Sequence, residues 1–258
     1  MKALVIGETC IDIFRYGKCE KMCPEAPVPV FTLTHEMNNN GGMARNVYRN
    51  LLNLGLDCGF ITYRAYLIPK KIRYIDEVSN QMLLRVDEND SVERIRTEQL
   101  NSIKFDEWDA MVISDYDKGF LTEDDIEFIS LNHPLVFLDT KKELGFWCED
   151  IKFIKLNEKE FYRNERYLTE DYSHNVIVTM GREGAWYQNK NIFIKPLERV
   201  EVRDVAGAGD TFLAAFVADY IKNADICNAI QFANKCASYV VTQRGVVAVD
   251  ITKINKNE

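Results

Sequence analysis

Histidine and clustered basic residues are scarce in this chain of 258 residues. The three histidines stand apart, and no Cys/His pair matches the close pair Cys19 and Cys23, so the spacing of a four-ligand zinc site is missing. The 32 basic residues form no long block and are outnumbered by 40 acidic ones, which gives a formal net charge of −8. We therefore expect neither structural zinc nor nucleic acid as the main partner.

Long apolar runs are also missing. The apolar start, residues 1–8, is too short for a signal peptide, and no later run reaches the length of a membrane span. The seven cysteines are scattered and odd in number, and a chain of this size does not need disulfide bonds. These absences predict a cytoplasmic protein with reduced thiols and no membrane partner.

Short β-rich runs alternate along the chain with helical patterns. Strands are expected at 2–6, 58–62, 110–113, 135–138, 153–156 and 176–179, and helices at 41–54, 122–130 and 157–163. Such alternation predicts an α/β fold with a mostly parallel central sheet and helices on both faces. Ligands of these folds bind beyond the carboxyl ends of the strands.

Extended segments interrupt this alternation twice. Residues 11–16 alternate in polarity and lead into the proline-containing stretch 24–31, and residues 71–87 again show period two. The prolines suit edge strands. We expect these segments, approximately 12–36 and 70–88, to form a small β-sheet lid within a single domain, 1–258. Because unpaired strand edges tend to find partners, we expect a homodimer through this lid.

A glycine turn precedes the apolar stretch 212–220. It reads Gly207-Ala208-Gly209 and is followed directly by Asp210. The unpaired N–H groups at a helix start attract anions, so the turn is a candidate phosphate site. A carboxylate beside a phosphate makes chemical sense as the base that accepts a hydroxyl proton during phosphoryl transfer. The alternative is an ordinary helix start with Asp in its first turn, and the sequence of the turn alone favours neither.

Polar residues recur where the expected strands end. They are Asp12 after Gly7, Asn46 after Gly41 and Gly42, Asp115 after Ser114, Asp139 with Lys141, Asn157 with Glu160, and Thr179 with Gly181 and Gly184. Each is explained singly as a cap or turn residue. Together they predict one cleft, because the carboxyl ends of parallel strands share an edge of the sheet.

Two of these segments resemble the paired signatures of the ribokinase, or PfkB, carbohydrate kinase family. Residues 41–47 resemble the N-terminal signature and residues 204–210 the C-terminal one, D-T-x-G-A-G-D. Residues 157–160 resemble the family's N-x-x-E element, and residues 179–184 its T-x-G-x-x-G turn. The resemblance runs from about residue 2 to 249. It implies a ribokinase-like three-layer sandwich and an ATP-dependent sugar kinase, which is a phosphotransferase.

The resemblance also implies roles for individual residues. Asp210 would be the catalytic base, and Gly207, Ala208 and Gly209 would donate backbone N–H groups to the transferring phosphoryl group. The sugar would be held by Asp12, Gly41, Gly42 and Asn46. Glu160 and Asn157 would organise Mg²⁺ near the ATP phosphates. The nucleotide would lie near Asn157, Thr179, Gly181, Gly184 and Asn234.

Within the family, three stretches resemble the heptose-phosphate kinases of ADP-heptose synthesis. Residues 24–30, 80–87 and 114–119 are similar to their S-P-E-A-P-V-P-V, N-Q-Q-L-L-R-x-D and S-D-Y-x-K-G. This implies phosphorylation of O1 of a heptose 7-phosphate. Arg85 and Lys118, with Arg45, are candidates to meet the substrate phosphate, and the alternative for each is a solvated surface charge.

The chain departs from the family pattern after Thr62. It passes to Lys71 with almost nothing between, where family members have a longer insert, so we expect one sheet-flanking helix to be missing. Two other functions remain open at this point. One is a kinase-like binding or regulatory protein without turnover, and the other is a kinase for another sugar or a nucleoside.

Overall fold

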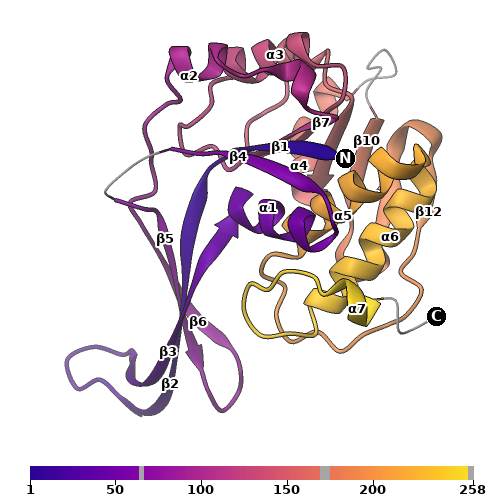
Figure 1. The fold of residues 1–258 in the computed structure, drawn as a ribbon. Coiled ribbons are helices and arrows are strands. Elements are labelled where there is room, and N and C mark those ends of the chain that lie inside the picture. The colour runs from indigo at the N-terminus through magenta and orange to yellow at the C-terminus, as the bar shows by residue number, and fades with distance from the viewer. Residues whose placement is uncertain (64–66, 169–174, 255–258) are drawn as a thin grey trace.

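Two β-sheets organise the computed structural model, which describes residues 1–63, 67–168 and 175–254 (Figure 1). The large sheet has eight strands in the order β12-β11-β10-β9-β8-β7-β1-β4. The small sheet has four strands in the order β3-β2-β5-β6. No helix of the described residues combines the length and apolar character that crossing a membrane requires.

The large sheet is parallel from β4 to β10 and antiparallel at β11 and β12. Its strands are β1 (Lys2–Gly7), β4 (Asp57–Ile61), β7 (Ala110–Asp115), β8 (Val136–Thr140), β9 (Phe153–Asn157), β10 (Asn175–Thr179), β11 (Ala185–Tyr187) and β12 (Ile192–Ile194). All six strands expected from the apolar runs are confirmed. These runs are apolar throughout because both faces of a parallel sheet are covered.

Helices cover both faces of this sheet, which makes three layers (Figure 1). One face carries α1 (Ala44–Asn53), α5 (Ala208–Asn223), α6 (Ile226–Val240) and α7 (Ile251–Ile254). The other carries α2 (Thr97–Asn101), α3 (Glu123–Asn132) and α4 (Glu158–Asn164). Five 3₁₀ turns, η1 to η5, span Phe105–Glu107, Phe146–Cys148, Glu165–Tyr167, Gly181–Glu183 and Gln188–Lys190. Neighbouring residues of β7 show the layering, since Val112 packs with the first face and Ile113 with the second.

Aromatic side chains fix α5 against the middle of the large sheet. Phe137 and Phe153 stack with ring centroids 5.0 Å apart. Phe216 and Tyr220 from α5 meet Phe153 edge-on, at 5.2 and 4.6 Å. Such pairs contribute packing energy beyond the burial of their area. They hold α5 in place, so its first turn lies at a defined point of the sheet's carboxyl edge.

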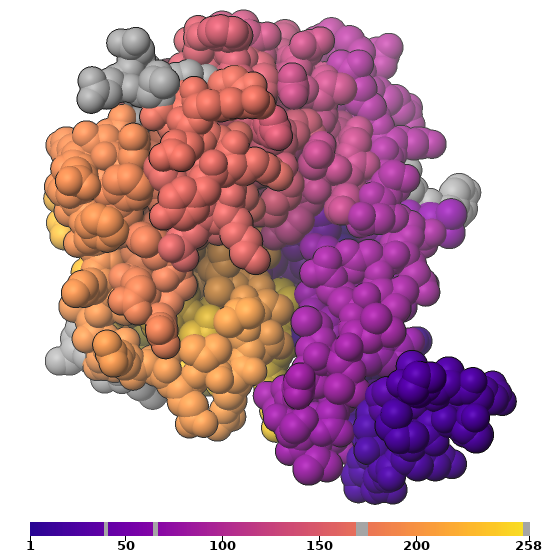
Figure 2. Space-filling model, turned by 180° about the vertical axis from the view of Figure 1, so that it is seen from behind, coloured from indigo at the N-terminus to yellow at the C-terminus, as the bar shows by residue number. Residues whose placement is uncertain are grey.

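The small sheet consists of β2 (Thr9–Met22), β3 (Pro29–Met43), β5 (Lys70–Asp76) and β6 (Met82–Glu88). It projects from the sandwich as a separate lobe (Figures 1 and 2). Phe14, Tyr16 and Ile75 form a cluster with Val246 of the sandwich. Only the part of the small sheet next to the sandwich is therefore anchored by apolar contacts.

Two local expectations need correction or completion. The helix expected at 41–54 starts only at Ala44, because Gly42 and Met43 still pair with β2, and Met43 breaks the strand with a φ of 62°. The described residues between β4 and β5 contain no helix. β4 is therefore an edge of the large sheet.

Candidate active site

Asp210 lies in the first turn of α5, where the structure also places Gly207, Ala208 and Gly209. Gly207 is the N-cap residue and has a left-handed φ of 79°. A Cβ atom at Gly207 would lie 2.7 Å from Nδ2 of Asn46, so both the backbone angle and the space require glycine. The turn thus presents its backbone closely to α1, with a carboxylate directly after it.

The Asp210 carboxylate is 4% exposed and accepts two side-chain hydrogen bonds. Oδ2 accepts from Nδ2 of Asn46 at 3.1 Å, and Oδ1 accepts from the hydroxyl of Tyr116 at 2.7 Å. Burial raises the pKa of Asp210 to about 6, while these two hydrogen bonds oppose the rise. Asp210 is consequently ionised at neutral pH and has a pKa suited to accepting a proton.

Asn46 is held in place by a second amide one helical turn away. Nδ2 of Asn50 donates to Oδ1 of Asn46 at 3.1 Å, and Oδ1 of Asn50 accepts from the backbone of Val249 at 2.8 Å. Asn46 also donates to the Gly207 carbonyl at 3.2 Å. This chain orients the Asn46 amide so that its NH₂ group faces Asp210. Our sequence reasoning missed Asn50, although its i,i+4 spacing from Asn46 is a usable signal.

Asp12 and the glycine pair Gly41 and Gly42 meet where β2 pairs with β3. A Cβ atom at Gly42 would lie 2.0 Å from Oδ2 of Asp12 and 2.6 Å from Sγ of Cys10, so no other residue fits there. Oδ1 of Asp12 forms an ion pair with Arg73 at 2.6 Å. The Asp12 carboxylate is therefore buried, fixed and next to the strand that leads into α1.

Two lysines and two carboxylates lie beside the glycine turn on the other side. Nζ of Lys155 contacts Oδ2 of Asp139 at 2.7 Å, and a Cβ atom at Gly209 would lie 3.1 Å from that nitrogen. Lys141 forms ion pairs with both Asp139, at 3.6 Å, and Glu160. Sequence reasoning missed Lys155. Its only sequence signal as a site residue is that it is a charged residue inside the buried strand β9. The cluster gives the turn two ammonium groups suited to phosphate oxygens.

Asn157 and Glu160 form the capping box of α4. Oδ1 of Asn157 accepts from the Glu160 backbone at 2.9 Å, and Oε2 of Glu160 accepts from the Asn157 backbone at 2.8 Å. Glu160 also contacts Lys141. Among the described residues no group of three metal-binding side chains occurs. Of the two carboxylates here, Asp139 keeps a buried Oδ1 that makes no hydrogen bond and lies 3.6 Å from Nζ of Lys141.

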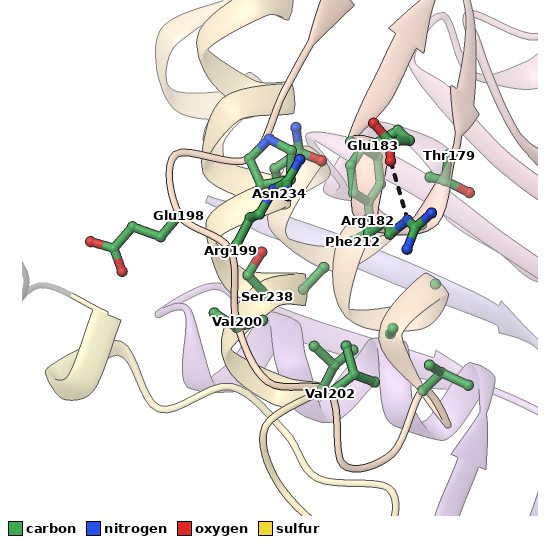
Figure 3. Close-up of a pocket in the computed structure, with 18 residues that line it drawn as sticks. Thr179, Arg182, Glu183, Glu198, Arg199, Val200, Val202, Phe212, Asn234 and Ser238 are labelled. Atoms are coloured by element: carbon green, nitrogen blue, oxygen red, sulfur yellow. Dashed lines mark ion pairs between the residues drawn. The ribbon is translucent and has the colours of Figure 1, made fainter.

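A cavity of about 590 Å³ adjoins the glycine turn (Figure 3). Its walls include Thr179, Gly181, Gly184 and Asn234, together with Ala208 and Gly209 of the glycine turn. Asn234 is buried and donates from Nδ2 to the Ile194 carbonyl at 2.8 Å, so it forms part of the wall. The size suits a ligand such as a nucleotide. The structure thus brings these four residues to one cavity that is also lined by Gly209, the residue before Asp210.

The three basic residues expected to meet a substrate phosphate have other neighbours. Arg85 forms a bidentate ion pair with Asp87 at 2.8 and 2.9 Å. Lys118 pairs with Asp90. Arg45 is exposed, with its guanidinium 5.9 Å from the centre of the Phe60 ring. Among the described residues, none of these three side chains forms a hydrogen bond or ion pair with Asp12, Asn46 or Asp210.

Tyr116 itself was given no role from the sequence, although it lies in the stretch 114–119 that resembles heptose-phosphate kinases. Glu8 is fully buried and accepts hydrogen bonds from the backbone N–H groups of Tyr116, at 2.8 Å, and Lys118, at 3.0 Å. Burial raises the pKa of Glu8, and these hydrogen bonds oppose the rise. Glu8 therefore fixes the loop that carries the Tyr116 hydroxyl to Asp210. The sequence signal for Glu8 is its position, since a charged residue directly after the buried strand β1 is unusual.

Comparison with known proteins shows the family of the chain. Residues 98–253 match the family of pfkB carbohydrate kinases, and the chain belongs to that family. The bifunctional protein HldE of a Nitratiruptor species is 30% identical to it over 303 aligned positions. The match covers 100% of this chain and 65% of that protein, so the chain spans slightly less than two thirds of the length of this relative.

Solved structures share the fold at low sequence identity. Ribokinase of Thermotoga maritima superimposes with a TM-score of 0.75 at 16% identity, covering 100% of this chain and 99% of the other. Ribokinase of Arabidopsis thaliana, complexed with ribose and ATP, gives a TM-score of 0.74 at 14% identity, covering 98% of each chain. The ribokinase-like fold and the resemblance to the PfkB family are confirmed. The protein is a carbohydrate kinase, a phosphotransferase whose family acts on small sugars.

Proposed function

We propose that this kinase uses ATP and Mg²⁺ to phosphorylate a sugar phosphate, heptose 7-phosphate at O1, with Asp210 as the base. The observation that carries the proposal is the position of Asp210. It is buried beside a glycine turn that also lines a nucleotide-sized cavity, and Asn46 and Tyr116 orient its carboxylate. The acceptor is inferred from the three stretches that resemble heptose-phosphate kinases, residues 24–30, 80–87 and 114–119.

The proposed reaction is an in-line transfer of the γ-phosphoryl group of ATP. The acceptor hydroxyl gives its proton to Asp210 while its oxygen forms a bond to phosphorus and the bond to ADP breaks. The N–H groups of Gly207, Ala208 and Gly209 hold the equatorial oxygens, and Lys155 adds positive charge beside Gly209. Because there is little covalent work for the protein, its contribution is alignment and charge neutralisation.

The two substrates are assigned to opposite sides of Asp210. Asp12, Asn46 and the backbone of Gly41 and Gly42 bind the sugar hydroxyls. The nucleotide occupies the cavity lined by Thr179, Gly181, Gly184 and Asn234 (Figure 3). The small sheet lies on the sugar side, since it carries Asp12, and excludes water from the acceptor.

The residues present fit a Mg²⁺ ion on the ATP side. Asp139 has a buried carboxylate oxygen without a hydrogen bond, and Glu160 shares Lys141 with it. Carboxylate oxygens next to phosphates suit Mg²⁺, which keeps several of its waters. When bound, the ion neutralises charge on the phosphate oxygens. Glu160 and Asp139 would hold it, and Asn157 would position Glu160 through the capping box.

The test combines turnover with product identification. ADP release is measured with heptose 7-phosphate as acceptor, and mass spectrometry with fragmentation locates the new phosphate. Asp210→Asn is expected to lower kcat by roughly 10²- to 10⁴-fold while ATP still binds. Asp219→Asn, the same change further along α5, is the matched control and should keep full activity.

Three outcomes would contradict parts of the proposal. Undiminished turnover by Asp210→Asn would remove Asp210 as the base. Turnover of other sugars or nucleosides, but not of heptose 7-phosphate, would leave a kinase with another acceptor. Tight binding of nucleotide or sugar without any turnover would indicate a binding or regulatory protein.

A further inference from the structure

Strand β5 places two cations on the face of the small sheet that also carries Asp12. In the parallel pairing of β2 with β5, Lys71 lies beside Asp12 and Arg73 beside Phe14. Because side chains alternate along a strand, these four residues share one face, while Lys70 lies on the other. Phe14 is buried, so this face is turned towards the interior of the molecule.

Arg73 is already neutralised within this face. Its NH1 donates to Oδ1 of Asp12 at 2.6 Å, and its guanidinium lies 4.9 Å from the centre of the Phe14 ring. Its side chain is only 14% exposed, so both charges of the pair are largely removed from water. The pair fixes Asp12 and leaves no net charge.

Lys71 differs from the basic residues around it. Its Nζ lies 4.5 Å from the centre of the Tyr116 ring, and in the described parts of the chain no carboxylate is within ion-pair distance of it. By contrast, Lys70 pairs with Glu88, and Lys118 pairs with Asp90. Lys71 is therefore a half-buried ammonium group without a counter-ion, one side chain away from Asp210, to which Tyr116 donates.

The next strand does not neutralise Lys71. Asp87 lies directly opposite Lys71 on β6, but both of its oxygens accept from Arg85. Arg85 in turn lies opposite Arg73, and two like charges placed opposite each other destabilise a sheet unless anions compensate them. These paired rows hold three basic side chains, Lys71, Arg73 and Arg85, against two acidic ones, Asp12 and Asp87. The excess positive charge lies on the acceptor side.

We propose that Lys71, supported by Arg73, binds the phosphate group that the acceptor already carries, and so makes the enzyme prefer a phosphorylated sugar. The inference rests on the proposed function, because that proposal assigns Asp12 and Asp210 to the acceptor. A phosphate supplies the anion that Lys71 lacks, whereas a neutral sugar leaves its ammonium group without a counter-ion. Arg85 and Lys118, already paired with carboxylates, have a smaller part in this recognition.

The test is a binding measurement that needs no turnover. Isothermal titration calorimetry compares D-glycero-D-manno-heptose 7-phosphate with the same heptose lacking phosphate. The wild-type protein is expected to prefer the phosphorylated sugar by about tenfold or more, as for a charge-assisted contact. Lys71→Met should lose this preference, Lys71→Arg should keep most of it, and the matched control Lys70→Met should keep all of it.

Several results would overturn the inference. They are equal binding of the two sugars by wild type, no binding of either, or an unchanged preference in Lys71→Met. A weaker affinity of Lys71→Met for a non-hydrolysable ATP analogue, with the sugar preference intact, would instead assign Lys71 to the transferred phosphate. Turnover separates the two proposals. If the preference depends on Lys71 but no ADP is released, only the proposed function fails.

Discussion

At the scale of single residues, the burial of Asp210 favours its proposed chemistry and opposes stability. Burial raises its pKa to about 6 from an ordinary value of 3.8. Between these values the folded protein binds more protons than the unfolded chain, so stability falls as the pH rises through this window. Above it, the ionised carboxylate costs the folded state roughly 3 kcal/mol.

Replacing this carboxylate should therefore stabilise the protein at neutral pH. Asp210→Asn cannot ionise, so its free energy of unfolding is expected to exceed that of wild type by about 1 to 3 kcal/mol above about pH 7. The gain should vanish near pH 4, where wild type is also protonated. Urea unfolding at both pH values measures this, and a variant no more stable at neutral pH would contradict it.

Tyr116 should set the pH dependence of the reaction. Burial and the neighbouring Asp210 hold the pKa of Tyr116 well above its usual value, so its hydroxyl remains a donor. Tyr116→Phe removes a hydrogen bond that lowers the pKa of Asp210, and the acidic limb of the profile of kcat/KM is expected to move up by about one pH unit. The phenyl ring beside Lys71 is kept.

The measurement is kcat/KM from about pH 5 to pH 9, with Tyr162→Phe, an exposed side chain on α4, as the matched control. The loss of kcat/KM in Tyr116→Phe should be largest at low pH. It should shrink as the pH rises, because at high pH Asp210 is ionised in both proteins. An acidic limb at the wild-type position would show that Tyr116 has no influence on the base.

At the scale of elements, local patterns predict strands better than the contacts between them. The run at β7 is apolar because both faces of the sheet are covered, and this is readable without the structure. The glycine turn and Asp210 were likewise visible, since their requirement is local. The ion pair of Lys155 with Asp139, which joins β9 to β8, was not, because it depends on which strands become neighbours.

The same limit explains why the sequence did not identify the side chain that we propose to bind the substrate phosphate. Arg85 and Lys118 lie in stretches that resemble heptose-phosphate kinases, and Arg45 lies in the N-terminal signature, but the sequence alone does not reveal which groups they pair with. Asp87 and Asp90 pair with the first two in the folded chain. Lys71 attracts attention only after the strand pairing shows that it lacks such a partner. The sign of a side chain's charge is thus predictable from the sequence, whereas its ion-pair partner is known only from the fold.

Two helices with the same type of N-cap offer a comparison between stability and function. Thr122 and Asp125 form the capping box of α3, and Asn157 and Glu160 form that of α4. Thr122→Ala and Asn157→Ala should each cost about 1 kcal/mol of stability. Only Asn157→Ala should also raise the KM for ATP, because its partner Glu160 lies at the proposed Mg²⁺ position.

Urea unfolding and steady-state kinetics at several Mg²⁺ concentrations check this pair of variants. Excess Mg²⁺ should partly restore the KM for ATP of Asn157→Ala and leave the kinetics of Thr122→Ala unchanged. Equal losses of activity in the two variants would show that α4 contributes only stability, and that Mg²⁺ is held elsewhere.

At the scale of the whole molecule, the proposed site is assembled from segments far apart in sequence. The small sheet contributes Asp12, α1 contributes Asn46, and α5 contributes Asp210. Most of the small sheet projects beyond the sandwich, with apolar contacts only near its base (Figure 2). Its position over the acceptor therefore depends on few contacts, and a second copy of the chain would supply more.

The outer part of the small sheet has the features of an interface. β3 and β6 are its edges, and Leu33, Met37, Met82 and Leu84 expose apolar side chains there. Open edges and exposed apolar side chains on both of them favour association, so we predict a homodimer through this sheet. Leu84→Asp, at a side chain that is 56% exposed, should weaken the dimer and raise the KM for the sugar more than that for ATP.

Sedimentation equilibrium at micromolar concentration checks the assembly, with Leu131→Asp on α3 as an equally apolar, exposed control. A wild-type monomer, or a Leu84→Asp protein that dimerises normally, would show that the sandwich alone holds the small sheet over the acceptor.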